Sequence, residues 1–315
     1  MILAYRIQDG QLVLSEISEA TILVYSQPIG IEKDQLLSEF SLDPLDLEAI
    51  NDPDEIPRIE ILEDGLLIIW NWPDNVSCGD TVQFEVSTIG LFLGRGKAVA
   101  IMPRGQLPIT GREFKRLASA EDFILRVVLY TVHQYQGHLK AIKMKSAELE
   151  SKVVTSMENK YLLQMFALGE SLVYYHNALE ANSTILTKLR GMAKRMGLTE
   201  EQIDFLDDVI IENQQAVKQA SIYSTVLSGL MDARGTIINN NMNVLLKNLT
   251  IINVVFLPLT FFASIGGMSE YSMMTQGIDW RIAYPAFILA MAVLGLLTWW
   301  WVVKMIDRSQ KERIC

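Results

Sequence analysis

The stretch LTIINVVFLPLTFFASIGG, residues 249–267, decides the fold, because it stays apolar over the length of a membrane span. A second stretch, AYPAFILAMAVLGLLTWWWVV, residues 283–303, contains no charged residue. At about 1.5 Å per residue in a helix, the two reach roughly 28 and 31 Å, close to the ~30 Å hydrocarbon thickness of a bilayer. We therefore expect two transmembrane helices over these ranges. The alternative is a pair of helices buried in the core of a soluble protein.

The residues that flank the two spans predict their orientation. Lys247 precedes the first span, and the connecting loop, residues 268–282, has Arg281 as its one basic residue. The tail that follows the second span, residues 304–315, is basic through Lys304, Arg308, Lys311 and Arg313. Basic flanks favour the cytoplasmic side, and Trp299–Trp301 has the composition of an interfacial belt. We expect a multi-pass protein of the inner (plasma) membrane, with both termini in the cytoplasm and the loop outside.

The remainder of the chain has the composition of an acidic folded protein. Of the 315 residues of the whole chain, 50% are hydrophobic and 20% charged, which is too apolar for disorder. The net charge is −10, and residues 1–247 hold 22 Lys and Arg against 33 Asp and Glu. A nucleic-acid partner is not expected, because neutralising phosphates needs a basic face. Two cysteines, Cys78 and Cys315, predict neither a disulfide framework nor a structural zinc site.

Residues 1–120 are expected to form a cytosolic α/β domain. Short apolar runs between turn signals, at 65–70, 89–93 and 98–102, are typical of strands. Residues 31–40 and 43–50 have helical spacing instead. The segment Gly94-Arg95-Gly96 predicts a hairpin turn, since it lacks the Gly-Lys-Ser/Thr ending of a phosphate loop.

Residues 121–248 are expected to form long helices and a stalk. Helical periodicity dominates from 121 to 189, and no proline occurs between Pro108 and Pro258. The glycines of Gly191–Thr199 interrupt the pattern, and Thr199-Glu-Glu-Gln202 predicts a capping box that starts the next helix. A long helix is then expected to run unbroken from about Asn213 through the first span.

Polar residues follow one face of this last helix. Reading every third or fourth position gives ten residues, which we call the stripe: Asp232, Thr236, Asn239, Asn243, Leu246, Leu249, Asn253, Leu257, Thr260 and Ser264. An unpaired amide in hydrocarbon costs several kcal/mol, so the stripe must face protein or water. Two spans cannot enclose a channel, and a ring of identical subunits with the stripe inward is one solution. The other is a helix-packing interface with polar contacts.

The chemistry of the stripe suits a hydrated divalent cation. Mg²⁺ gives up its water reluctantly, so rings of Asn carbonyls and hydroxyls that bind the hydration shell would let it pass. Asp232 is expected to collect ions, and Leu246, Leu249 and Leu257 to form apolar constrictions that close by dewetting.

Two acidic clusters and three histidines have less specific functional interpretations. Asp43–Asp64 holds nine carboxylates and Glu200–Glu212 six; they are either solvated faces or attract cations near a pore mouth. The histidines are His133, His138 and His176. None has a paired Ser, Cys or metal-ligand partner in the pattern, so an enzyme is not expected.

Three motifs in the stalk and first span carry a family resemblance. Asn243–Thr250 resembles the pattern N-x-V-M-K-x-L-T, with Leu245 and Leu246 in place of its Val and Met. Phe256–Thr260 matches F-x-P-L-T, and Gly266–Ser269 stands where Y-G-M-N is found. In this order and spacing the chain resembles the CorA superfamily of divalent metal cation transporters. Weaker similarity extends to Val226–Asp232, Gln83–Met102 and Glu121–Glu150.

The resemblance implies an α+β membrane protein that assembles as a homopentamer. The first span lines the pore and the second lies outside the pore ring. The positions that match Asp232, Asn243, Leu249 and Leu257 line the pore in that family. Magnesium held between cytosolic domains closes it, and Asp208 matches one of the carboxylates involved. The loop that first receives the hydrated ion corresponds to Gly267, Met268, Ser269 and the adjacent Glu270. No cofactor is implied beyond the divalent cation itself.

The departures from the family pattern leave the transported ion open. Ser269 replaces the loop Asn, Gly266 replaces the Tyr, and Asn253 adds an amide to the span. Mg²⁺, or Co²⁺ or Ni²⁺, is the default cargo. A ZntB-like Zn²⁺ transporter is the alternative, although the stripe has no thiolate or imidazole to favour zinc. A further alternative is a non-conducting, membrane-anchored metal sensor or scaffold.

Overall fold

A seven-stranded sheet lies in the first of two units, Met1–Met231 and Asp232–Cys315. The computed structural model describes residues 1–78, 81–109, 111–155 and 159–311. The strands are β1 (Ile2–Gln8), β2 (Gln11–Leu14), β3 (Ile22–Ser26), β4 (Arg58–Leu62), β5 (Gly65–Cys78), β6 (Thr81–Gly94) and β7 (Lys97–Met102). Their order in the sheet is β2-β1-β3-β7-β6-β5-β4. Among the described pairs, β3 and β7 are parallel and the others antiparallel.

The predicted strands and turn of this domain are confirmed. Residues 65–70, 89–93 and 98–102 lie in β5, β6 and β7. Gly94 pairs with Lys97, and the two residues between them, Arg95 and Gly96, have φ angles of 52° and 71°. Two consecutive left-handed residues are what a tight hairpin turn requires. The sheet is largely antiparallel because β4 to β7 follow one another as hairpins.

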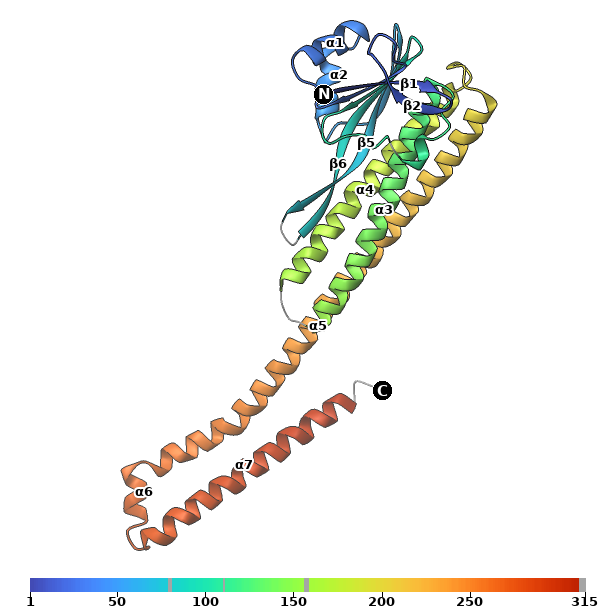
Figure 1. The fold of residues 1–315 in the computed structure, drawn as a ribbon. Coiled ribbons are helices and arrows are strands. Elements are labelled where there is room, and N and C mark those ends of the chain that lie inside the picture. Colours follow the sequence, from blue (N-terminus) through green and yellow to red (C-terminus); the bar gives the residue numbers. More distant parts are fainter. Residues whose placement is uncertain (79–80, 110, 156–158, 312–315) are drawn as a thin grey trace. The chain divides into compact units, whose positions relative to one another are not determined.

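Helices cover both faces of the sheet (Figure 1). On one face lie α1 (Ile31–Glu39) and α2 (Pro44–Asn51), in agreement with the predicted helices there. Asp43 caps α2: its side chain accepts a hydrogen bond from the Leu45 N–H, while the Asp46 carboxylate accepts one from the Asp43 N–H. The core on this face includes Leu36, Phe40, Ile50, Leu67 and Phe92.

The opposite face is covered by three long helices. They are α3 (Ala120–Thr155), which follows the short 3₁₀ turn η1 (Arg112–Phe114), α4 (Asn159–Met192) and the first part of α5 (Glu200–Gly266). Phe123, Leu186 and Leu206 pack there with Trp70 and Leu91 of the sheet. Farther along, the same helices pack on one another through a second core that includes Tyr135, Leu172, Tyr175 and Ala216.

Helix α5 begins earlier than the pattern predicted. The expected capping box is present, because the Thr199 N–H donates to Gln202 Oε1 at 2.9 Å and the Gln202 N–H donates to Thr199 Oγ1 at 3.3 Å. From Glu200 the helix then continues without interruption to Gly266, over 67 residues. The helix expected after Thr199 and the helix expected from about Asn213 are therefore one.

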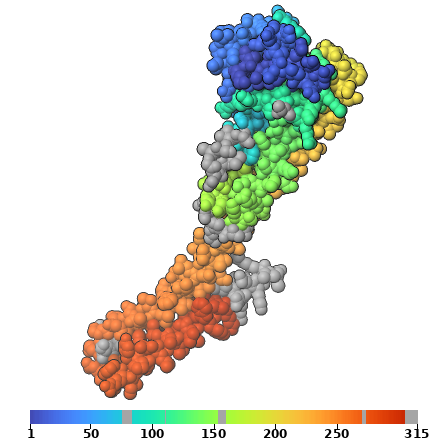
Figure 2. All heavy atoms as spheres, viewed as in Figure 1, coloured from blue at the N-terminus to red at the C-terminus, as the bar shows by residue number. Residues whose placement is uncertain are grey.

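The second unit contains an apolar helical hairpin. The end of α5 is followed by α6 (Ser269–Met274) and α7 (Trp280–Lys311), so the two predicted spans lie in α5 and α7 and the connecting segment holds a short helix. Figure 2 shows the side chains of α5 and α7 on the surface of this unit. Of the most apolar window, 0% is buried in α5 and 6% in α7. Helices of a soluble core would be mostly buried, so the membrane interpretation is favoured.

Candidate ion pathway

Every residue of the stripe is exposed in the chain. The stripe starts in a polar part of α5 at Asp232 and ends in its apolar part at Ser264. At about 100° per residue, Asn239, Asn253, Leu257 and Ser264 fall within roughly 40° of one another around the helix. The regular helix therefore places these amide, hydroxyl and leucine side chains along one side, as the spacing predicted.

Helix α7 packs on the other side of α5. The partly buried residues of α5 in this region are Ile251, Val255, Pro258, Leu259 and Gly266. Two contacts fix the pairing: a Cβ on Gly295 would lie 3.3 Å from Leu259 Cδ1, and a Cβ on Gly266 would lie 2.6 Å from the Phe287 ring. These α5 positions lie roughly 140–240° from Asn253 around the helix. The second helix of the hairpin thus leaves the stripe uncovered.

Two hydroxyl groups of the stripe, those of Thr236 and Thr260, are arranged as acceptors. Thr236 Oγ1 donates to the Asp232 carbonyl at 3.1 Å, and Thr260 Oγ1 donates to the Phe256 carbonyl at 2.9 Å. With their protons used inside the helix, these oxygens offer only lone pairs to the outside. Water bound to a cation points its hydrogens outward, so oxygen acceptors can hold a hydrated ion. Asn243 and Asn253 add carbonyl oxygens of the same kind.

The segment after α5 begins with a tightly packed turn. The N–H groups of Gly267 and Met268 donate to carbonyls of the last helical turn, at 3.1 Å to Ala263 and 3.1 Å to Ile265. Ser269, which is exposed, then starts α6. The side chain of Glu270 lies outside the described residues. The predicted ion-receiving residues are therefore contiguous and lie at the end of the stripe-bearing helix.

The acidic residues near the start of α5 differ in their pairing. Asp207 forms a double ion pair with Arg190, whose Nε lies 2.6 Å from Oδ1 and whose second nitrogen lies 2.9 Å from Oδ2. Hydrogen bonds from Arg190 lower the pKa of the Asp207 carboxyl. Asp208 is exposed and has no ion pair with a described residue. Asp208 is thus the carboxylate of the two that remains open to a cation.

Within the part of one chain that the structure describes, the carboxylates do not build a complete metal site. Among the described residues, no three His, Cys, Asp or Glu side chains come together closely enough to hold a metal ion. A metal bound at Asp208 would therefore need ligands besides these side chains.

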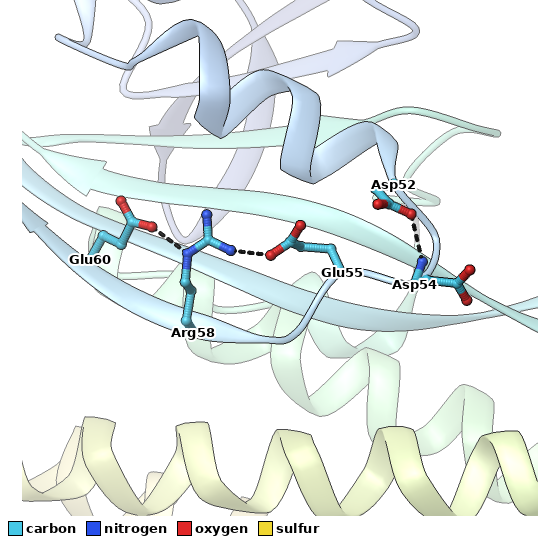
Figure 3. Close-up of polar contacts among 5 residues, drawn as sticks. All are labelled: Asp52, Asp54, Glu55, Arg58 and Glu60. Carbon is cyan, nitrogen blue, oxygen red and sulfur yellow. Dashed lines mark hydrogen bonds and ion pairs between the residues drawn. The ribbon is translucent and has the colours of Figure 1, made fainter.

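Many carboxylates of the Asp43–Asp64 cluster have structural partners. Figure 3 shows the Arg58 guanidinium between Glu55 and Glu60, with which it forms ion pairs, and Asp52 accepting a hydrogen bond from the Asp54 N–H at 2.9 Å. Asp64 pairs with Arg95. For most of the cluster, these contacts favour the interpretation as a solvated surface over cation attraction near a pore mouth.

The histidines and buried amides of the first unit hold elements together. His133 bridges Glu113 and Glu212, with ring nitrogens 3.2 and 2.9 Å from their oxygens. No sequence pattern indicated a role for Asn182, which is fully buried and bonds to both backbone groups of Asn71. The partner lies 111 residues away in the chain, so no local spacing could reveal it.

Comparison with known proteins identifies the family. The family model described as CorA-like Mg²⁺ transporter protein matches residues 22–304. The chain belongs to the CorA family. A cobalt/magnesium transport protein CorA from Methanocaldococcus jannaschii is 23% identical over 281 residues, which cover 83% of this chain and 86% of the relative. YfjQ of Bacillus subtilis is 37% identical over 227 residues, which cover 68% of this chain and 69% of that protein.

The CorA fold is also found by structural comparison. The complete structure of the CorA magnesium transporter from Methanocaldococcus jannaschii superposes with a TM-score of 0.74 over 98% of both chains, at 21% sequence identity. The resemblance seen in the motifs around Asn243, Phe256 and Gly266 is therefore confirmed at the level of family and fold. CorA proteins are membrane transporters, in keeping with the two apolar helices of this chain.

Proposed function

We propose that this CorA protein transports divalent cations as a homopentameric channel of the inner (plasma) membrane, with the stripe lining a central pore. The observation that carries the proposal is the exposure of the stripe on the side of α5 opposite α7. In a bilayer, an amide such as that of Asn253 cannot remain against lipid without a large cost. Copies of α5 arranged in a ring would bring the stripe to shared water.

The order of side chains along the stripe suits passage of a hydrated ion. Asp232 would raise the local cation concentration at the cytoplasmic end, and Asn243 and Asn253 would bind the hydration shell. Leu246, Leu249 and Leu257 would form narrow apolar rings between the polar ones. Such rings close when they dewet, so the same stripe provides both binding and gating.

Magnesium is the proposed cargo, with Co²⁺ and Ni²⁺ as further substrates. The relative from Methanocaldococcus jannaschii is named as a cobalt/magnesium transport protein. Oxygen ligands suit Mg²⁺, and the stripe lacks the thiolate and imidazole groups that favour zinc. Ser269, shorter than the Asn of the family motif, would capture the incoming ion more weakly. Asp208 would bind a cytosolic metal together with a neighbouring subunit and so close the channel.

The test is flux through the purified channel in liposomes. Liposomes loaded with a Mg²⁺-sensitive dye should fill when Mg²⁺ is added outside, and cobalt(III) hexammine, which keeps its ligand shell, should block the flux. The variant Asn243→Leu should reduce the rate at least about tenfold, because it removes a hydration-shell acceptor from each subunit. Asn241→Leu is the matched control: Asn241 is also exposed on α5 but lies about 200° around the helix from Asn243.

Several outcomes would contradict the proposal. Equal flux in the two asparagine variants would remove the stripe from the pathway. Zinc flux without magnesium flux would favour the ZntB-like alternative. A pentamer that carries no Mg²⁺, Co²⁺, Ni²⁺ or Zn²⁺ would favour a sensor or scaffold, and a particle with other than five chains would contradict the assembly.

A further inference from the structure

A groove of about 590 Å³ lies in the first unit, away from the stripe. One wall is the 53–57 loop between α2 and β4, the second is formed by β5 and β6, and the third by α4. This volume is within the range of about 300–1,000 Å³ typical of small-molecule sites. The proposed transport mechanism assigns no role to it.

The rim of the groove is strongly acidic. Asp54 and Glu55 come from the loop, Glu85 from β6 and Glu170 from α4, whereas none of the described lining residues is Lys, Arg or His. Arg58 is turned toward Glu55 and Glu60, and the Asp54 carboxylate points away from it (Figure 3). Asp54, Glu85 and Glu170 form no ion pair with a described residue. The groove therefore has unneutralised carboxylates on three separate elements.

The negative potential of these groups acts on Tyr174, which lies in the α4 wall. The carboxylates of Glu170 and, to a lesser extent, Asp54 raise the pKa of the Tyr174 phenol. The hydroxyl donates to Glu170 Oε1 at 3.3 Å, and the residue is 53% exposed. An exposed aromatic ring beside carboxylates is a suitable surface for an organic cation.

Asn71 contributes a buried acceptor that has no donor. It lines the groove and is 7% exposed. Its backbone N–H and C=O bond to Asn182, but its side-chain Oδ1 has no hydrogen-bond partner. The neighbouring Ser171 is fully used, since it accepts from the Phe84 N–H and donates to the Ala167 carbonyl. A buried carbonyl left without a donor is costly, and a bound ligand with an N–H group would satisfy it.

Besides the polar side chains of Gln83 and Asn177, the remaining lining is apolar. Ala167, Ala178 and Ala181 form a small-residue surface along α4, opposite Ile56 and Pro57 of the loop. Bare metal ions gain nothing from such a surface, and the described residues offer no three-ligand metal cluster. Methylene groups, in contrast, are stabilised by burial against it.

We propose that this groove binds a linear polyamine, with one ammonium donating to Asn71 Oδ1, others paired with Asp54, Glu85 and Glu170, and the methylene chain lying along the alanines of α4. A polyamine carries several positive charges at fixed separations, which fits carboxylates distributed over three walls. Its ammonium groups are donors without acceptors, complementary to the acceptors that line the groove.

Equilibrium dialysis with radiolabelled spermidine on the full-length protein in detergent tests the proposal. Saturable binding of one spermidine per chain is expected. Asn71→Leu and Glu170→Gln should each weaken it at least about fivefold, because each removes an acceptor that pairs with an ammonium. Glu150→Gln, at an exposed carboxylate of α3 that does not line the groove, is the matched control and should bind as the unaltered protein does. Glu170 is exposed, so its variant will fold even if the Asn71 variant does not.

Two results would overturn the inference. One is spermidine binding that is unchanged in Glu170→Gln, or weakened equally in Glu150→Gln, as expected for general attraction to an acidic protein. The other is displacement of spermidine by MgCl₂ but not by NaCl of equal ionic strength, which would assign the carboxylates to a divalent cation. Because binding is measured without flux, failure of the transport proposal does not affect this test.

Discussion

Replacement of Asn182 by alanine should destabilise the first unit by about 3 kcal/mol. The described pairing of β4 with β5 ends at Arg58 and Ile69, so the outer edge of β5 at Asn71 faces α4 instead of a strand. Asn182 completes that edge: the Asn71 N–H donates to its Oδ1 at 3.1 Å, and its Nδ2 donates to the Asn71 carbonyl at 2.9 Å. The side chain therefore replaces a missing strand.

The magnitude follows from the two groups left without partners. Asn182 is fully buried and Asn71 is 7% exposed, so water cannot easily replace the lost bonds. Each orphaned backbone group costs about 1–3 kcal/mol, so the two together cost roughly 2–6 kcal/mol, and the predicted value of about 3 kcal/mol lies in the lower half of this range. For a domain of this size, that corresponds to a decrease in Tm of roughly 6–12 °C.

Thermal unfolding of the full-length protein in detergent, followed by circular dichroism, measures the change. Hydrogen exchange of a peptide that contains Asn71 should accelerate in Asn182→Ala at temperatures well below the transition. The control is Asn177→Ala, at an exposed asparagine on the same helix, which should shift the unfolding free energy by less than about 0.5 kcal/mol. A similar small shift for Asn182→Ala, with unchanged exchange at Asn71, would refute the assigned role.

Three further predictions concern pH, the hairpin and the loop. Burial lowers the pKa of His138 below its ordinary value of 6.5, so the unfolded chain binds this proton at a higher pH than the folded chain does, and the unfolding free energy should fall as pH decreases below about 6.5. In thermal unfolding measured at several pH values, His138→Gln should make the unfolding free energy depend less on pH. An unchanged pH dependence would exclude His138 as its source. Gly266→Val should lower the Tm of the detergent-solubilised protein, because a Cβ would lie 2.6 Å from the Phe287 ring. Adding Phe287→Ala should recover part of the lost Tm, and no recovery would contradict the steric explanation. Ser269→Asn should lower the Mg²⁺ concentration for half-maximal flux about threefold or more by restoring an amide oxygen at the loop, whereas a higher value would show that Ser269 does not limit capture.

Local patterns were sufficient to predict several of the elements and the side of α5 on which the stripe lies. The capping box at Thr199, the turn at Gly94–Gly96 and the strands at 65–70 and 98–102 each depend on residues close in sequence, and all are present. The face of α5 could be predicted because a regular helix fixes the direction of every side chain from its spacing alone.

Features that join distant segments could not be predicted in the same way. The parallel pairing of β3 with β7 brings Ile22 beside Ala98, and apolar alternation does not specify the partner of a strand. The proximity of Glu85 and Glu170 at the groove likewise depends on where the 53–57 loop, β6 and α4 meet, so no sequence pattern could predict it. The side of α5 that α7 covers was also unknown, since each apolar helix could present several faces to the other.

Helix α5 belongs to both units, and this continuity has a mechanical consequence. Hydrogen bonds connect each turn of an α-helix to the next, so a rotation of α5 near Thr199 is transmitted along the helix axis to Asn253. A helix bends and twists most easily at glycine, which has no side chain to restrict the backbone. Gly229 and Gly235 lie on either side of the boundary at Met231, and neither has an atom within 4 Å of the position that a Cβ would take. Replacing both glycines by alanine would stiffen the helix there, so a rotation of α5 within the first unit would reach Asn253 with less loss.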